Sequence, residues 1–179
     1  MRENNSKREI IFLKGQTLGI QKGLTLENKI ISALTKIMLI GEYIHTIDDK
    51  NRVSLPVKFR KEMGRKIIIT PGLDKCLFIF TAKEWCKISC KLSSSDSGLS
   101  FLKADKRSFN RFMFGRAAEI EVDSIGRILI PDFLKEMINL SDKAAIIGVE
   151  DRVEVWNDKT WSAYKEKAEK EASSLAERL

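Results

Sequence analysis

The sequence of 179 residues has few of the residues that build metal centres. It contains three cysteines and one histidine. The cysteines, Cys76, Cys86 and Cys90, form no C-x-x-C pair, whereas a structural zinc site usually has four ligands at characteristic spacing. We therefore expect no metal and no cofactor, and we expect the three thiols to be reduced and partly buried.

Patterns typical of enzymes are also missing. His45 lies in an apolar stretch and is more typical of a half-buried strand residue than of a catalytic base, because no nucleophile accompanies it. The sequence has no glycine-rich phosphate-binding loop. It therefore predicts a protein that is not an enzyme and that has no small-molecule substrate.

Long apolar stretches are absent as well. No segment approaches the ~20 apolar residues that a membrane-spanning helix needs. The apolar run at residues 10–13 is too short for the hydrophobic part of a secretory signal. These absences predict a cytoplasmic protein with no membrane partner.

The sequence is rich in positive charge, and this charge is unevenly distributed. The formal net charge is +7. Residues 1–37 hold seven Lys/Arg against three Asp/Glu, residues 38–108 hold fourteen against eight, and residues 109–179 hold eleven against fourteen. The basic first part is typical of a protein surface that faces a polyanion, and uneven solvated surfaces without a partner are the alternative interpretation.

One motif occurs twice in the chain. Residues 48–56 read DDKNRVSLP and residues 123–131 read DSIGRILIP, so Asp, Arg and Pro recur at a constant offset of 75 residues. Around each copy the residue pattern predicts a strand, a tight turn, a second strand and a short helix that begins at the proline. A further hairpin and helix follow in each copy. The chain therefore contains one structural unit used twice.

The repeat defines the predicted domains. Residues 38–92 form a first domain, residues 93–114 a linker and connecting helix, and residues 115–179 a second domain that ends in a helix. Residues 1–37 are an extension, disordered or weakly helical, and Met38 could be an alternative translation start. A unit of about 50 residues is marginal as a separate fold. We therefore expect an α+β fold with a mostly β core, in which both copies pair about a pseudo-two-fold axis into a closed β-barrel with flanking helices.

Several motifs, in order and at matching spacing, give the repeated region a family resemblance. They are GEYIHTID at residues 41–48, the two Asp-x-x-x-Arg motifs, GLDKCL at residues 72–77 and GRILIP at residues 126–131. Residues 38–179 resemble MraZ, a family of bacterial regulators in the AbrB-like (SpoVT-AbrB) DNA-binding superfamily. The resemblance implies a double AbrB-like repeat and assembly of several subunits into a ring. It also implies a nucleoid-associated regulator, generally a repressor, that binds short repeated DNA elements upstream of its own operon, the division and cell wall gene cluster.

The same resemblance makes the Asp-x-x-x-Arg motif the signature site, with its arginine and a neighbouring basic residue on DNA. Lys50 and Arg52 lie two residues apart at the first turn, so Arg52 can hold a guanine edge while Lys50 neutralises a phosphate. Arg127 is the weaker candidate, because Ser124 and Ile125 stand where the first turn has a lysine and because its half of the chain is acidic.

The remaining motif residues are expected to shape the turns. Asn51 and Gly126 occupy the same place in the two copies, which predicts a positive φ at both. Asn51, where the family commonly has glycine, is counted with the DNA-facing residues. The residues expected to have a structural role are Asp48, Asp123, Gly126, Pro56 and Pro131. For both aspartates, this role is an ion pair with the arginine four residues later.

A second function remains open from the sequence. A non-enzymatic protein-interaction or scaffold module, such as a toxin–antitoxin-like protein, could use the same barrel to bind protein, with DNA binding incidental. The two functions predict different partners, namely double-stranded DNA with promoter repeats, or a second protein.

Overall fold

A computed structural model describes residues 38–94 and 102–178. The chain divides into two units, Met1–Lys36 and Ile37–Leu179, and the description below concerns the second. The predicted N-terminal extension at residues 1–37 and part of the predicted linker, residues 95–101, lie outside the described residues.

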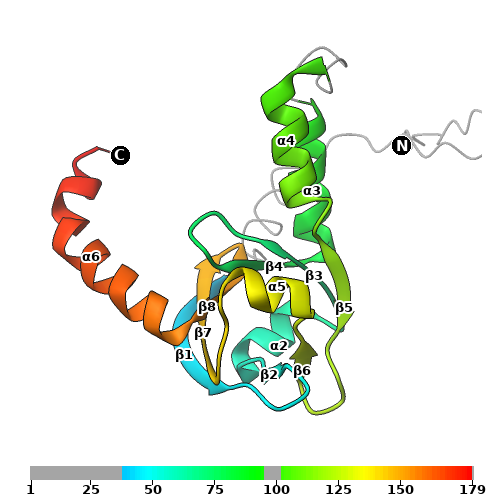
Figure 1. Cartoon of the computed structure of the whole chain (residues 1–179), viewed down its shortest axis with the longest axis vertical. Helices are drawn as coiled ribbons and strands as arrows, with labels where there is room; N and C mark the ends of the chain where they lie inside the picture. Colours follow the sequence, from blue (N-terminus) through cyan, green and yellow to red (C-terminus); the bar gives the residue numbers. More distant parts are fainter. Residues whose placement is uncertain (1–37, 95–101, 179) are drawn as a thin grey trace, which may run out of the picture. The chain divides into compact units, whose positions relative to one another are not determined.

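Eight strands form two antiparallel sheets in this part of the chain. The larger sheet has six strands in the order β1 (Leu39–Thr46), β7 (Lys143–Glu150), β8 (Arg152–Asn157), β4 (Leu77–Thr81), β3 (Lys66–Pro71) and β5 (Ala118–Glu121). The smaller sheet, which we call the β2–β6 ribbon, pairs β2 (Arg52–Ser54) with β6 (Arg127–Leu129). Strands of both sequence copies therefore contribute to each sheet (Figure 1).

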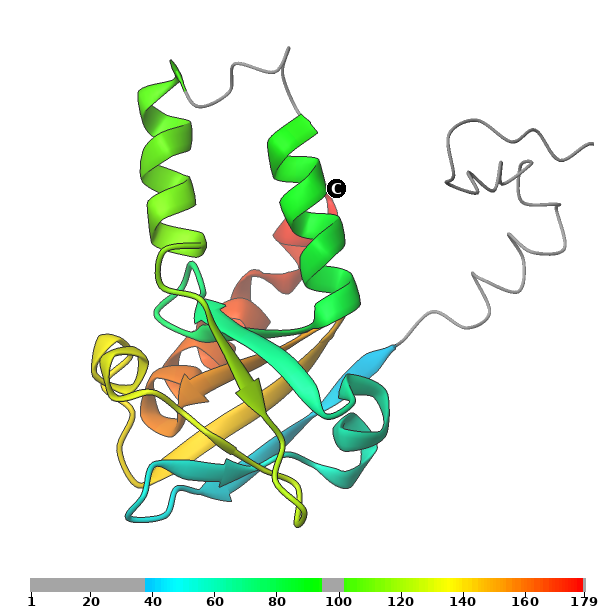
Figure 2. The ribbon, with the colours of Figure 1, turned by 90° about the vertical axis from the view of Figure 1, so that its right-hand side faces the viewer.

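Five helices accompany the sheets in the described residues. They are α2 (Val57–Met63), α3 (Ala82–Ser94), α4 (Ala104–Met113), α5 (Asp132–Met137) and α6 (Asp158–Ala176). Figure 1 and Figure 2 show α3 and α4 side by side, projecting from the end of this unit that lies away from the β2–β6 ribbon. At their base, Trp85 packs against Phe114 with ring centroids 5.0 Å apart. No helix in the described ranges is long and apolar enough to cross a membrane.

The second predicted hairpin of each copy is confirmed, because β3 pairs with β4 and β7 pairs with β8, whereas the first predicted hairpin of each copy is not formed as a ladder. β1 pairs along its length with β7, and β5 pairs with β3, so neither forms a ladder with the strand that follows it. The first predicted hairpin keeps only a bridge between Ile47 and Val53 and a hydrogen bond from the Asp48 N–H to the Arg52 carbonyl at 3.0 Å. Local periodicity identifies strands but not their partners, and here the three-residue strands β2 and β6 pair with each other across the repeat.

The α+β fold with a mostly β core is confirmed, but the predicted closed barrel is not found. The edge strands of the six-stranded sheet are β1 and β5, and they are not paired with each other in the described residues. Tight turns lead from each of them into the β2–β6 ribbon instead (Figure 2). The three-residue strands of the ribbon are too short to continue the ladder around the core.

The ribbon rests on a core formed by both copies. Fully buried members of this core include equivalent residues of the two repeats: Val53, Leu55, Phe59, Ile128, Ile130 and Leu134. Because the ribbon and both short helices contribute to one core, the orientation of the ribbon depends on packing from both halves of the chain.

A second cluster lies beneath α3 and α4. Trp85 and Ile88 pack against it, together with Phe109, Phe114 and the buried Met113. Cys76 is buried in it, and burial raises the pKa of its thiol to about 12. The prediction of partial burial was wrong for Cys86 and Cys90, which are exposed because other residues form the packed face of α3.

The buried centre of the ribbon provides a test of this core. Ile128 has no exposed surface, whereas Ile125 at the neighbouring turn is 60% exposed. We expect Ile128→Ala to lower the free energy of unfolding by about 2–5 kcal/mol, because it leaves a cavity that the core cannot fill. Ile125→Ala is the matched control and should change it by less than about 0.5 kcal/mol. Urea unfolding followed by circular dichroism measures both, and equal effects would contradict the packing described here.

Candidate nucleic-acid interface

The β2–β6 ribbon brings the two copies of the motif together. Three cross-strand pairs form it: Arg52 with Leu129, Val53 with Ile128, and Ser54 with Arg127. Val53 and Ile128 are equivalent positions of the repeat, so the pairing is centred on them. Since successive side chains of a strand point to opposite faces, burial of this central pair puts the other four side chains on one outer face. The outer face of the ribbon is therefore made of Arg52, Ser54, Arg127 and Leu129.

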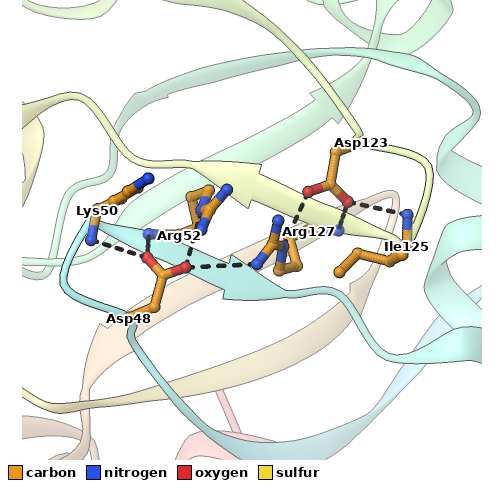
Figure 3. Close-up of polar contacts among 6 residues, drawn as sticks. All are labelled: Asp48, Lys50, Arg52, Asp123, Ile125 and Arg127. Atoms are coloured by element: carbon orange, nitrogen blue, oxygen red, sulfur yellow. Dashed lines mark hydrogen bonds and ion pairs between the residues drawn. The ribbon is translucent and has the colours of Figure 1, made fainter.

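The Asp48 carboxylate closes the first turn and orients Arg52. Its Oδ1 accepts hydrogen bonds from the backbone N–H groups of Lys50 at 3.0 Å and Arg52 at 2.8 Å. Its Oδ2 accepts from Arg52 Nε at 2.8 Å. One side chain thus fixes both the turn backbone and the direction of the guanidinium (Figure 3).

The second turn repeats this arrangement. Asp123 Oδ1 accepts from the N–H groups of Ile125 at 3.1 Å and Arg127 at 2.8 Å, and Oδ2 accepts from Arg127 Nε at 2.8 Å. The copies differ in one contact, because Arg127 Nη1 also lies 3.5 Å from Asp48 Oδ2. Figure 3 shows the two arginines next to each other on the ribbon, between the two aspartates. Arg127 is therefore held by two carboxylates and Arg52 by one.

The first turn retains more unpaired positive charge than the second. Within the described ranges the terminal nitrogens of Arg52 have no protein partner, and its side chain is 30% exposed. Lys50 is exposed, and its ammonium group forms no ion pair with any described residue. Each Asp–Arg pair is neutral as a whole, so Lys50 leaves an excess positive charge that Ile125 does not provide in the second turn.

Both aspartates have lowered pKa values. For Asp48, burial raises the pKa, but hydrogen bonds from the Arg52 backbone, the Arg52 guanidinium and the Lys50 backbone together lower it further than burial raises it. For Asp123, the backbone hydrogen bond from Arg127 is the main cause of the lowering. Both carboxylates are therefore ionised at neutral pH and hold their arginines by charge as well as by geometry.

The predicted positive φ is confirmed at both turns. It is +59° at Asn51 and +86° at Gly126. These two residues also extend the ribbon, because the Asn51 carbonyl accepts from the Ile130 N–H at 3.0 Å and the Gly126 carbonyl accepts from the Leu55 N–H at 2.9 Å. Each turn is thereby joined to the other copy of the motif.

Two basic helix residues, which the sequence reasoning did not identify as site residues, complete the turns. Lys135 on α5 donates to the Asn51 side-chain oxygen, and the Asn51 amide nitrogen donates to Asp132. Arg60 on α2 donates to the Leu55 carbonyl and lies over Gly126, where an added Cβ would overlap its side chain. The sequence did contain a signal, because each is the basic residue four positions after the proline of its motif.

The two prolines immediately precede these helices. Pro56 accepts from the Arg60 N–H at 3.0 Å and Pro131 accepts from the Lys135 N–H at 3.0 Å. Both have ψ near 140°, so they are the capping residues and the first helical residue follows them. This arrangement places the basic residue of each helix over the turn of the opposite copy.

His45 is half-buried on β1, as predicted, and its pKa is lowered by burial and by the charge of Arg60. Among the described residues, no three His, Cys, Asp or Glu side chains are grouped so that they could hold a metal ion. The ribbon and its turns are therefore the candidate site.

The sequence model of the MraZ family, described as "MraZ protein, putative antitoxin-like", matches residues 38–112 and 113–179. The chain belongs to the MraZ family. Each matched segment contains one copy of the Asp-x-x-x-Arg motif. Proteins called transcriptional regulator MraZ are similar to it. The one from Acetivibrio thermocellus is 46% identical over 142 residues, which are 79% of this chain and 96% of the relative.

Two further relatives called transcriptional regulator MraZ are similar to this chain to a comparable extent. The transcriptional regulator MraZ of Moorella thermoacetica is 43% identical over 142 residues, which are 79% of this chain and 96% of the relative. That of Caldicellulosiruptor saccharolyticus is 50% identical over 124 residues, which are 69% of this chain and 84% of the relative. The family relationship therefore covers the described unit and both copies of the motif.

The lowered pKa values predict how the stability of the turns depends on pH. A carboxylate whose pKa is lower in the folded state stabilises that state above its unfolded pKa of about 3.9, and this contribution is lost as pH falls through the folded pKa. We therefore expect Asp48→Asn and Asp123→Asn to reduce stability at pH 7 and to weaken its decline below about pH 4. Asp49→Asn, in the same turn, is the matched control and should behave like the unaltered protein. Urea unfolding at a series of pH values measures the effect.

The positive φ at Gly126 gives a backbone prediction. Gly126→Ala should destabilise the fold by about 1–2 kcal/mol, because a Cβ is unfavourable in the left-handed region. Gly126→Asn should cost less, since Asn51 adopts this conformation in the equivalent turn. Thermal unfolding of the two variants distinguishes them, and a larger loss with Asn than with Ala would contradict the assignment.

Proposed function

We propose that this protein is a sequence-specific DNA-binding transcriptional regulator and that its β2–β6 ribbon reads DNA. The observation that carries the proposal is the outer face of the ribbon, on which two arginines are oriented by carboxylates beside Lys50, whose ammonium group pairs with no residue of the described ranges. The similarity to relatives called transcriptional regulator MraZ supports it.

The ribbon has the dimensions and chemistry for the major groove of DNA. That groove admits a two-stranded β-ribbon, and the planar fork of arginine matches the O6 and N7 acceptors of guanine. Arg52 is bound through Nε, which leaves its terminal nitrogens for a base edge, whereas Arg127 is bound through Nε and also has Nη1 paired with Asp48. Because the aspartates fix the arginines before DNA arrives, less side-chain entropy is lost on binding.

The residues of the site have different tasks in this proposal. Arg52 is the main base-reading residue, and Lys50 neutralises a phosphate. Arg127 contributes less, because it is shared between two carboxylates. Asn51 belongs to the DNA-facing turn, and its contacts with Asp132 and Lys135 support a positioning role.

We further infer that the two copies of the repeat are related by a pseudo-two-fold axis through the ribbon. Two registers support this inference. The ribbon is centred on Val53 and Ile128, which are equivalent residues, and β4 pairs with β8 around Phe78 and Glu154. An approximate axis of this kind would present one arginine to each half of a short DNA element.

The finer biological role is part of the same proposal. The protein is proposed to repress the division and cell wall gene cluster by binding short repeated elements upstream of its own operon, as a nucleoid-associated homo-oligomeric ring. The edge strand β1, with exposed Ile40 and Ile44, supports an assembly of several copies. Several ribbons on one assembly would bind repeated elements with high effective concentration.

A protein-interaction module is the second candidate function. The antitoxin-like wording of the family description favours it. It predicts a protein partner and no preferred DNA sequence, so the DNA-binding measurement below separates it from the first proposal.

DNA binding should depend on the first turn and on salt. We expect Arg52→Ala to weaken binding to the upstream DNA by about 1–3 kcal/mol and to relax its sequence preference, because a bidentate base contact is lost. Lys50→Ala should weaken binding to all sequences and reduce the slope of log K against log salt by about 1. Fluorescence anisotropy at several salt concentrations measures both effects.

Lys83 provides the control for this measurement. It is an exposed lysine on α3, so Lys83→Ala removes the same charge far from the ribbon and should leave affinity and slope unchanged. Binding that survives Arg52→Ala and Lys50→Ala together, with its sequence preference intact, would overturn the ribbon as the reading element.

A further inference from the structure

The outer face of the ribbon differs between the two copies in its polarity. Ser54 of the first copy is equivalent to Leu129 of the second, and Lys50 of the first turn is equivalent to Ile125 of the second. Leu129 is 52% exposed and Ile125 is 60% exposed. Each end of the reading face therefore presents one large apolar side chain to solvent: Leu129 opposite Arg52, and Ile125 in the turn that precedes Arg127.

These apolar residues lie within the charged site and not apart from it. Leu129 is directly opposite Arg52 in the ribbon, and Ile125 donates its N–H to the same aspartate that holds Arg127. A protein that binds DNA through this face would bury both residues against the duplex. The apolar group that the major groove displays is the C5-methyl of thymine.

We propose that Leu129 and Ile125 contact thymine methyl groups and so make the recognised DNA element asymmetric. This inference rests on the proposed function. At the first-turn end Leu129 reads thymine beside Arg52 and Lys50, and at the second-turn end Ile125 reads thymine beside Arg127 and Ser54.

The register of the ribbon places Leu129 directly opposite the base-reading Arg52. Side chains directly opposite each other on antiparallel strands have Cβ atoms ~5 Å apart, and successive bases of a DNA strand are ~3.4 Å apart. Leu129 and Arg52 can therefore reach the same or adjacent base pairs. The element should contain a thymine at or next to the guanine that Arg52 reads.

Charge complementarity favours DNA over a protein surface as the occupant. The same outer face carries Arg52 and Arg127 beside Leu129, and the first turn adds Lys50. A second copy of this chain would have to bury the excess charge of Lys50 together with the apolar side chains, and burial of a charge without a partner is costly. A subunit interface at this patch is nevertheless an outcome that the experiment distinguishes.

The test uses the full chain and a duplex selected by it from a randomised DNA library. Each thymine of the selected duplex is replaced in turn by deoxyuridine, which removes only the methyl group. We expect about a fourfold loss of affinity at one or two positions, the contribution of one buried methyl group each. With Leu129→Ser, which places the residue of the first copy in the second, the replacement next to the guanine should have no effect.

Matched variants and a second measurement complete the design. Ser54→Leu should create a new methyl-sensitive position next to the base pair that Arg127 faces, and Ile125→Lys should remove sensitivity only at the position that faces the second turn. Light scattering reports the number of subunits. An unchanged number with Leu129→Ser supports the DNA contact, and dissociation of the assembly overturns it in favour of a subunit interface.

The remaining outcomes separate this inference from the proposed function. Sequence-preferring binding that is insensitive to every deoxyuridine replacement overturns the methyl contact and leaves the regulator intact. A selected element without thymine would likewise overturn the methyl contact and leave the proposed regulator function intact. Binding without any sequence preference overturns both.

Discussion

The site depends on the pairing of β2 with β6 over the buried pair Val53 and Ile128. Neither three-residue strand could persist alone, because it has one buried side chain and few ladder hydrogen bonds. Paired across the repeat, the strands fill the centre of a core to which both copies contribute. The same pairing places the two arginines side by side, so the packing of the core and the geometry of the proposed DNA-reading face have a single cause.

The helices add a second constraint of the same kind. α2 follows the first motif but its Arg60 lies over the second turn, and α5 follows the second motif but its Lys135 holds the first. Each turn therefore contacts helix residues that lie up to 84 positions away in the sequence but are adjacent in space. These contacts couple the turn of each half of the chain to a helix of the other half.

Local features of the site could be predicted from the sequence. The two turns, the positive φ of Asn51 and Gly126, and the short helices after the prolines depend on nearby residues with strong conformational preferences. The pairing of β1 with β7 could not be predicted, because strand periodicity specifies faces but not neighbours. The contacts of Asn51 with α5 could not be predicted from the sequence either, because these residues are brought together by the pairing of β2 with β6.

In the proposed complex with DNA, the ion-paired arginines of the ribbon contribute mainly to sequence specificity, and the unpaired charge of the first turn contributes mainly to affinity. An arginine bound to an aspartate contributes little net charge at long range, so the clamped pairs attract DNA weakly but present a fixed fork to a base edge. An unpaired lysine attracts DNA at long range and reads nothing. In the first turn Lys50 supplies the charge that the Asp48–Arg52 pair lacks, and in the second turn Ile125 does not. In the proposed DNA complex the two copies of one motif therefore take different parts of the recognition, because a single substituted turn residue changes the balance between attraction and reading.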